Sequence, residues 1–128
     1  MSKLENVAKE INIEHLSMML VQSWCKETAC GEWAPENPSM NQCAVTALVI
    51  QDLHGGDILR CTMTDGDSHY WNCIKDIHYD FTVDQFDNIE PKPLRNTAEV
   101  RTRQYILSYP TTMFRYGILL QRLSKVME

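Results

Sequence analysis

The sequence predicts an α+β fold in which a cysteine-bearing, buried helix packs on a small antiparallel sheet. Residues 43–53 are almost all apolar or small, as in a helix that is buried on most sides. Residues 57–81 carry strand-forming residues that are interrupted by turn residues, as in consecutive antiparallel strands. Further helical patterns lie before and after these segments, so we expect flanking N- and C-terminal helices. Because helices and strands are segregated along the chain, the order is that of an α+β domain.

The composition is that of a globular protein. The chain has 128 residues, of which 44% are hydrophobic and 23% charged, and we expect one domain over residues 1–128. The net charge of -5 gives no electrostatic reason for binding nucleic acid or acidic membranes. No apolar stretch approaches the roughly 20 residues that span a bilayer, and the polar start at Met1 lacks a signal-peptide pattern. Five cysteines cannot all pair with one another, so we expect reduced thiols and a cytoplasmic protein.

The first half of the chain reads as helix, loop and helix. An apolar stripe at helical spacing predicts a helix over residues 12–25. Residues 28–41 contain glycine and proline and predict a long ordered loop. The buried helix should then end at Gly55-Gly56, which supply a left-handed cap and a turn.

The second half begins with three predicted strands. They cover residues 57–63, 68–74 and 77–81. Thr82 and Gln85 have the spacing of a capping box, which predicts a short helical turn. The remaining expectations are a loop over residues 88–97, a helix over 98–107 and a final helix from Thr111 or Thr112.

Cys43, His69 and Asp80 are the candidate catalytic residues. Cys43 stands at the predicted start of the buried helix, where backbone N–H groups and the helix dipole favour a thiolate. A turn at Ile74-Lys75 would place His69 directly opposite Asp80. A turn one residue later would place Trp71 opposite Asp80 and leave His69 diagonal to it. Both registers keep the imidazole and the carboxylate on one face of the sheet, and only a three-residue turn without a compensating bulge would separate them.

These residue types suit nucleophilic catalysis. Cys43 would attack a carbonyl carbon, His69 would act as general base and acid, and Asp80 would orient the imidazole. The Cys43 backbone N–H and the Gln42 side chain are candidate oxyanion donors, and Trp71 is a candidate substrate contact. No cofactor is needed.

Two other groups of residues give weaker indications of function. Cys61, His69, Cys73 and His78 could surround a zinc ion, but the chain has no Cys-x-x-Cys or His-x-x-x-His motif, so we predict no metal site. Arg101 and Arg103 are interpreted as part of a solvated helix face.

Two motifs in the middle of the chain resemble the transglutaminase-like core, which shares its arrangement with papain-like enzymes. They are His69-Tyr70-Trp71-Asn72 and Asp80-Phe81-Thr82. The resemblance covers roughly residues 42–82. It implies a catalytic cysteine at a helix N-terminus, with histidine and aspartate on succeeding strands. The segment from His69 to Asp80 is shorter than in many such enzymes, and the papain-type glutamine lies several residues before the cysteine, whereas Gln42 is adjacent.

The chain as a whole resembles the YunG-like family of small bacterial proteins, a resemblance that implies no particular substrate. The motifs that carry it are Ser23-Trp24, residues 41–47, Gly55-Gly56, residues 69–72, residues 80–82 and Arg115-Tyr116.

The sequence therefore predicts a cysteine-dependent hydrolase or acyltransferase that acts on an amide, thioester or isopeptide carbonyl. The alternative is a non-catalytic binding or regulatory module on the same scaffold. The substrate, a peptide, protein or small amide, is not specified by the sequence, and neither is the oligomeric state.

Overall fold

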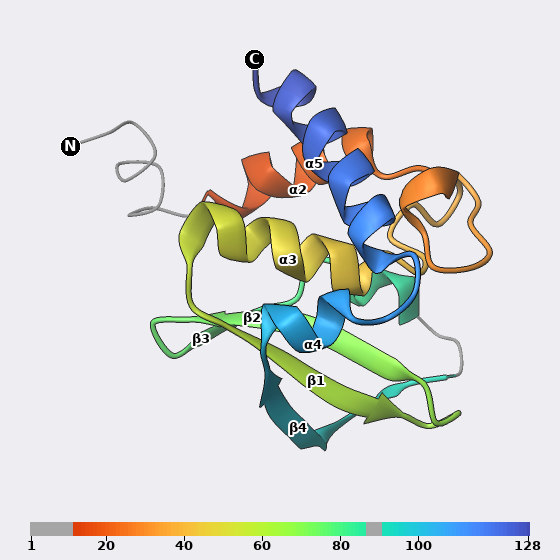
Figure 1. Ribbon diagram of the computed structural model, residues 1–128, viewed down its shortest axis with the longest axis vertical. Coiled ribbons are helices and arrows are strands. Elements are labelled where there is room, and N and C mark those ends of the chain that lie inside the picture. Colours follow the sequence, from red (N-terminus) through yellow and green to blue (C-terminus); the bar gives the residue numbers. More distant parts are fainter. Residues whose placement is uncertain (1–11, 87–90) are drawn as a thin grey trace.

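The computed structural model describes residues 12–86 and 91–128 and has an α+β architecture (Figure 1). Its sheet has four antiparallel strands in the order β3-β2-β1-β4. The strands are β1 (Asp57–Met63), β2 (Ser68–Ile74), β3 (Ile77–Tyr79) and β4 (Pro93–Arg101). The predicted polar segment from Met1 lies outside the described residues.

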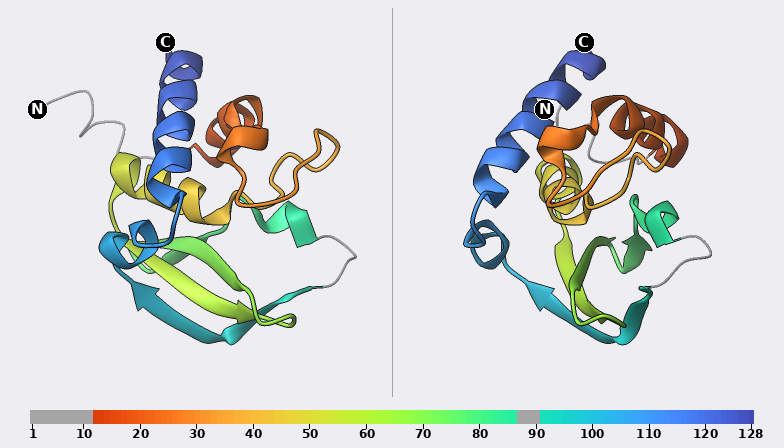
Figure 2. Two further views of the ribbon diagram at one scale, coloured as in Figure 1. Left: turned by 45° about the vertical axis from the view of Figure 1, so that its right-hand side comes forward. Right: turned by 90° about the vertical axis from the view of Figure 1, so that its right-hand side faces the viewer.

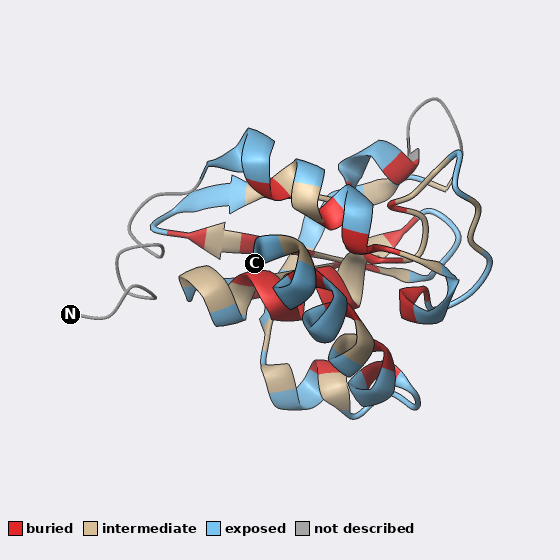
Figure 3. Cartoon of the chain, turned by 90° about the horizontal axis from the view of Figure 1, so that it is seen from above, coloured by how far each residue is buried: buried red, intermediate tan, exposed pale blue. Residues whose placement is uncertain are grey.

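The predicted buried helix is α3 (Cys43–His54), and it forms the middle layer of the molecule. It packs on β2 on one side and on α5 (Thr112–Met127) on the other. Helix α2 (Ile13–Ser23) packs along α5, so these two helices cover the side of α3 that faces away from the sheet (Figure 2). Buried residues accordingly gather on α3 (Figure 3). None of the helices in the described part of the chain is both long and apolar enough to cross a bilayer.

Two glycines end α3 as predicted. Gly55 has φ 73° and its N–H bonds the carbonyl oxygen of Gln51 at 2.8 Å, while Gly56 has φ 79°. Such left-handed conformations carry little steric cost only in glycine, so the helix stops here and the chain turns into β1.

The β2–β3 turn decides between the two predicted registers. Ile74 pairs with Ile77, which leaves Lys75 and Asp76 as the turn residues, with φ 51° and 65°. Two consecutive positive φ values are the mark of a type I′ hairpin turn. The register therefore has Asn72 opposite Tyr79, and extending it by one residue puts Trp71 opposite Asp80.

The segment after β3 differs most from the prediction. Residues 93–101, expected to be loop and helix, form strand β4 along β1, and only Arg103–Leu107 (α4) is helical. The hydroxyl oxygen of Thr97 accepts the Thr62 N–H at 2.8 Å where the β1–β4 register shifts. Part of the expected loop, residues 88–90, lies outside the described residues. The third predicted strand also ends early, at Tyr79.

The predicted capping box at Thr82 does not form. The Thr82 N–H points to the Asp80 carboxylate, and the Gln85 side-chain oxygen accepts the Asn41 N–H at 3.0 Å. The turn is a 3₁₀ helix, η2 (Val83–Phe86), and Gln85 ties it to the loop that precedes α3.

Candidate functional site

His69 and Asp80 form a short hydrogen bond. His69 Nε2 lies 2.6 Å from Asp80 Oδ2, and the histidine is 0% exposed. The bond joins diagonal neighbours, since Trp71 occupies the position opposite Asp80. The imidazole and the carboxylate thus meet on one face of the sheet, as both predicted registers required.

The Asp80 carboxylate has further partners on both oxygens. Arg95 from β4 reaches Oδ2 at 2.8 Å, and the hydroxyl and N–H of Thr82 lie 3.4 and 3.3 Å from Oδ1. Burial opposes ionisation of this carboxyl, but its bonds to His69 and Arg95 outweigh burial and lower the pKa of Asp80. Asp80 is therefore a carboxylate at neutral pH and can only accept. In the neutral ring of His69 the proton then resides on Nε2, which leaves Nδ1 as the basic nitrogen.

Trp71 lies beneath Arg95 and is buried. The Arg95 guanidinium carbon stands 4.6 Å from the indole centroid, and the indole N–H donates to His78 Nδ1 at 2.8 Å. Only 4% of Trp71 is exposed, so the indole supports Arg95 and His69. This position differs from that of the expected substrate contact, because the neighbouring side chains already cover the ring.

Cys43 lies beside the open edge of β2. The Tyr70 N–H faces the sulfur, at a point where the described sheet has no strand next to β2 because β3 ends opposite Asn72. The side chains of Tyr70 and Asn72 pack against α3, so the imidazole of His69 lies on the other face of β2. The Tyr70 N–H and the charge of Asp80 both act on the Cys43 sulfur, the first lowering and the second raising the pKa of its thiol.

The Cys43 thiol is not the activated thiolate that the helix start led us to expect. The residue begins α3 and is partly exposed, but burial of its sulfur raises the pKa to about 12. The N–H groups of Tyr70 and Ala44 lower this value and the Asp80 charge raises it. Desolvation of a thiolate thus outweighs the backbone donors, and the thiol is protonated at neutral pH.

Gln42 belongs to the framework of the loop. It is 0% exposed, its Nε2 donates to the Cys25 carbonyl oxygen at 3.0 Å, and its Oε1 accepts the Thr28 hydroxyl at 2.7 Å. Both ends of the amide are therefore engaged, in contrast to the expected oxyanion role. The bonds fix the segment before Cys43 and so set the start of α3.

A pocket of about 520 Å³ opens at Cys43. Its walls come from the loop around Cys30, from the β1–β2 turn and from α4 and α5. Tyr70 from β2 and Arg115 from α5 also line it. A small molecule in this pocket would reach Cys43 directly.

In the described ranges 12–86 and 91–128, no three His, Cys, Asp or Glu residues are grouped so as to hold a metal ion. The residues considered for zinc have other contacts. His69 bonds Asp80, and His78 accepts from Trp71. A metal would have to displace these bonds.

Arg95 bonds Asp80, and Arg115 lines the pocket at Cys43. The sequence analysis assigned a function to neither residue. Arg95 fell in a segment expected to be loop, so no register placed it near Asp80. Arg115 appeared only as part of a family motif, and its burial depends on how α5 packs. The one available signal for Arg115 was its place in the Arg115-Tyr116 motif that carries the resemblance to the YunG-like family.

Comparisons with known proteins identify the family but no activity. The family model described as YunG protein matches residues 12–128. A 74-residue stretch, 58% of the chain, is 46% identical to a Bacillus subtilis (strain 168) relative described as an uncharacterized protein YunG. This stretch spans 63% of the relative's length. No solved structure matches the chain.

Proposed function

The chain belongs to the YunG family, and from the geometry of its site we propose that it is a cysteine-dependent hydrolase or acyltransferase with a papain/transglutaminase-like core. Cys43 is the nucleophile, His69 the general base and acid, and Asp80 the orienting carboxylate. The observation that carries the proposal is the 2.6 Å bond between His69 Nε2 and Asp80 Oδ2. It holds the ring in one tautomer with Nδ1 as the base.

The order of elements supports the papain/transglutaminase-like core. The cysteine begins a helix that packs on the sheet, while the histidine and aspartate come from β2 and from the residue after β3. The same arrangement characterises the family that the His-x-Trp and Asp-Phe-Thr motifs resemble.

The reaction begins with a neutral thiol. We propose that the His69 imidazole, which lies on the other face of β2, meets the Cys43 sulfur at the open edge of that strand. There Nδ1 takes the thiol proton as the sulfur forms a bond to the carbonyl carbon of the substrate. The carbonyl oxygen becomes an oxyanion, for which the Cys43 backbone N–H is the candidate donor. The imidazolium, stabilised by Asp80, then protonates the leaving group, and a thioester with Cys43 remains. Water or an acceptor amine, deprotonated by His69, releases the acyl group.

A raised thiol pKa is compatible with this sequence of steps. The proton leaves the sulfur during the attack, when charge moves to the carbonyl oxygen, so no free thiolate needs to accumulate. The bonds and charges of His69 and Arg95 lower the pKa of Asp80 despite its burial, so the carboxylate is ionised and can stabilise the imidazolium.

The test is acylation of Cys43 by a small activated ester, p-nitrophenyl acetate. We expect one equivalent of nitrophenolate in a burst and an acetyl group on the Cys43 peptide by mass spectrometry. Cys43→Ala should remove the adduct. His69→Gln should slow acylation by about 100-fold or more, the usual contribution of a general base.

The matched control is His15→Gln, which removes an exposed histidine in α2. It should leave the acylation rate within about twofold. Since His69 is buried, Asp80→Asn serves as a second, nearly isosteric variant, and circular dichroism reports whether each variant folds. Acylation of Cys43 at the wild-type rate in folded His69→Gln or Asp80→Asn would refute the proposed mechanism.

A non-catalytic binding module is the second candidate, and the thiol pKa of about 12 is the observation that favours it. In that case the pocket at Cys43 would bind a ligand without reacting, and the His69–Asp80 pair would be structural. The ester experiment separates the two, because a binding module gives no His69-dependent burst.

A further inference from the structure

Arg115 is a buried cation in the wall of the Cys43 pocket. It lies in the first turns of α5, it is only 6% exposed, and it lines the pocket together with Cys43. Arginine is almost never buried to this extent unless its charge is paired.

The structure gives Arg115 neutral partners only. Its Nε donates to the Thr111 hydroxyl oxygen at 3.2 Å and one terminal nitrogen donates to Thr112 Oγ1 at 3.0 Å. Across residues 12–86 and 91–128, ion pairs are formed by Arg95, Arg101 and Arg103, whereas Arg115 has no carboxylate within ion-pair distance. Two threonine hydroxyls orient the guanidinium but do not neutralise it, so its charge is available to a ligand.

The charge of Arg115 acts on the pocket. Burial raises the pKa of the Cys30 thiol, which shares the pocket wall, and Arg115 is the largest influence that lowers it. Asp65 and Asp67 also line the pocket, but both are exposed to solvent and stand at its rim. The pocket is thus positive at its buried wall and negative at its mouth.

From this arrangement we propose that Arg115 binds the carboxylate of a small, singly charged acyl compound whose reactive carbonyl faces Cys43. The assignment of a reacting carbonyl rests on the proposed function, whereas the anion site rests on Arg115 alone. A planar guanidinium matches a carboxylate with two parallel hydrogen bonds. The acidic rim disfavours a doubly charged phosphate, and the Ala44, Tyr70 and Ile106 side chains in the wall suit a short hydrocarbon segment.

Iodoacetate and iodoacetamide test this site, because they differ little except in carrying a carboxylate or a neutral amide. Both would alkylate Cys43 in the full chain carrying Cys30→Ala, at one mildly alkaline pH, with the Cys43 peptide quantified by mass spectrometry. The rate ratio of iodoacetate to iodoacetamide is divided by the same ratio for N-acetylcysteine. We expect a normalised ratio of about 10, equivalent to one good charge-assisted interaction.

Arg115→Gln should bring this ratio back to about 1, while Arg115→Lys should keep part of the preference. Arg101→Gln is the matched control, since Arg101 does not line the pocket, and it should leave the ratio unchanged. A ratio near 1 in the wild type, or an equal ratio in folded Arg115→Gln, would overturn the proposal.

A second measurement needs no variant. Butyrate, a singly charged carboxylate with a short hydrocarbon segment, should slow the alkylation of Cys43 by iodoacetamide more than chloride or inorganic phosphate does at equal ionic strength. Stronger protection by phosphate, or none by butyrate, would contradict a carboxylate site. If the ester burst is absent but the preference for iodoacetate remains, the catalytic proposal is wrong and the anion site stands. If the burst occurs but the preference is absent, only the anion site is wrong.

Discussion

His69 Nε2 lies 2.6 Å from Asp80 Oδ2, although the two residues are diagonal rather than opposite across the β2–β3 pair. Diagonal neighbours in a sheet are farther apart than directly opposite residues, but the long imidazole side chain spans the difference. The opposite position holds Trp71, whose ring stacks with His69 and carries Arg95 on it. The register of one turn therefore brings an imidazole, a carboxylate and a guanidinium together.

Asp80→Asn should make the protein less stable at neutral pH and remove part of its acid sensitivity. The pKa of Asp80 is lowered in the folded state, so its ionised form stabilises the fold at any pH above the unfolded value of about 3.9. That contribution is lost as the pH falls through the folded pKa. We expect the variant to lose about 1 to 3 kcal/mol near pH 6, with a smaller difference near pH 3.

Urea unfolding over this pH range measures the effect, with Asp76→Asn as the control. Asp76 is an exposed carboxylate in the β2–β3 turn, where asparagine tolerates the positive φ. A difference between wild type and Asp80→Asn that stays constant from pH 6 to pH 3 would contradict this account.

Alkylation of Cys43 by iodoacetamide should rise steadily with pH. Because burial raises the pKa of this thiol to about 12, the reactive thiolate should increase about tenfold per pH unit between about pH 6 and pH 9. N-acetylcysteine, with a pKa near that of a free thiol, should begin to level off within this range. A plateau for Cys43 below about pH 8 would mean that the thiolate exists before attack, as the helix start alone suggested.

The parts of the fold that sequence predicted best are those fixed by local chemistry. The run of apolar residues after Cys43 is long for a strand and so favours a helix, which Gly55 and Gly56 end because they adopt positive φ. The pairing of His69 with Asp80 could be predicted because two-residue turns allow few registers, and each one keeps these residues on one face. The raised pKa of the Cys43 thiol could not be predicted, since it depends on burial by segments that are distant in the sequence.

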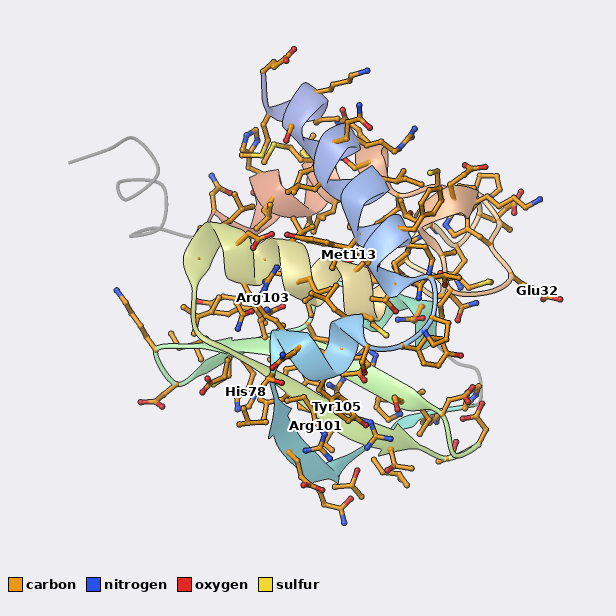
Figure 4. All side chains as sticks on the ribbon, in the orientation of Figure 1. Glu32, His78, Arg101, Arg103, Tyr105 and Met113 are labelled. Carbon is orange, nitrogen blue, oxygen red and sulfur yellow. The ribbon has the colours of Figure 1, made fainter. Side chains whose placement is uncertain are left out.

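Strand β4 and the contacts of Arg95 and Arg103 could not be predicted from the sequence, because they too depend on segments that are distant in the chain. Residues 93–101 are mostly exposed and lack alternating hydrophobic residues, because β4 is an edge strand with charged side chains such as Arg95 and Glu99. Arg103, which is labelled in Figure 4, was interpreted as part of a solvated helix face. It instead donates to the Leu48 carbonyl oxygen at 3.0 Å and pairs with Asp52. These contacts are set by tertiary packing, which leaves no local pattern.

Gln42→Ala should destabilise the protein, because it removes a buried amide that bonds the Cys25 carbonyl oxygen and the Thr28 hydroxyl. Cys25 and Thr28 would keep the bonds they make to each other. The loss of the two amide bonds and the cavity left by the buried side chain should together cost about 2 kcal/mol in the free energy of unfolding. Gln121→Ala, an exposed glutamine in α5, is the matched control and should cost less than about 0.5 kcal/mol. If Gln42→Ala left stability unchanged but abolished the ester burst, Gln42 would act in catalysis after all.

Gly56→Ala should be far more costly than Gly66→Ala, although both glycines have positive φ, 79° and 91°. A Cβ at Gly56 would lie 2.5 Å from the Cys73 carbonyl oxygen and 2.9 Å from a side-chain carbon of Ile74, whereas one at Gly66 would meet nothing within 4 Å. Gly66→Ala should therefore cost only the backbone strain, about 1 kcal/mol, and Gly56→Ala about 3 kcal/mol, because α3 must move away from β2. Urea unfolding of the two variants measures the difference. Equal losses in the free energy of unfolding would mean that the start of β1 can shift without disturbing β2. The close approach of Gly56 to Cys73 would then not fix the position of the end of α3 on the sheet.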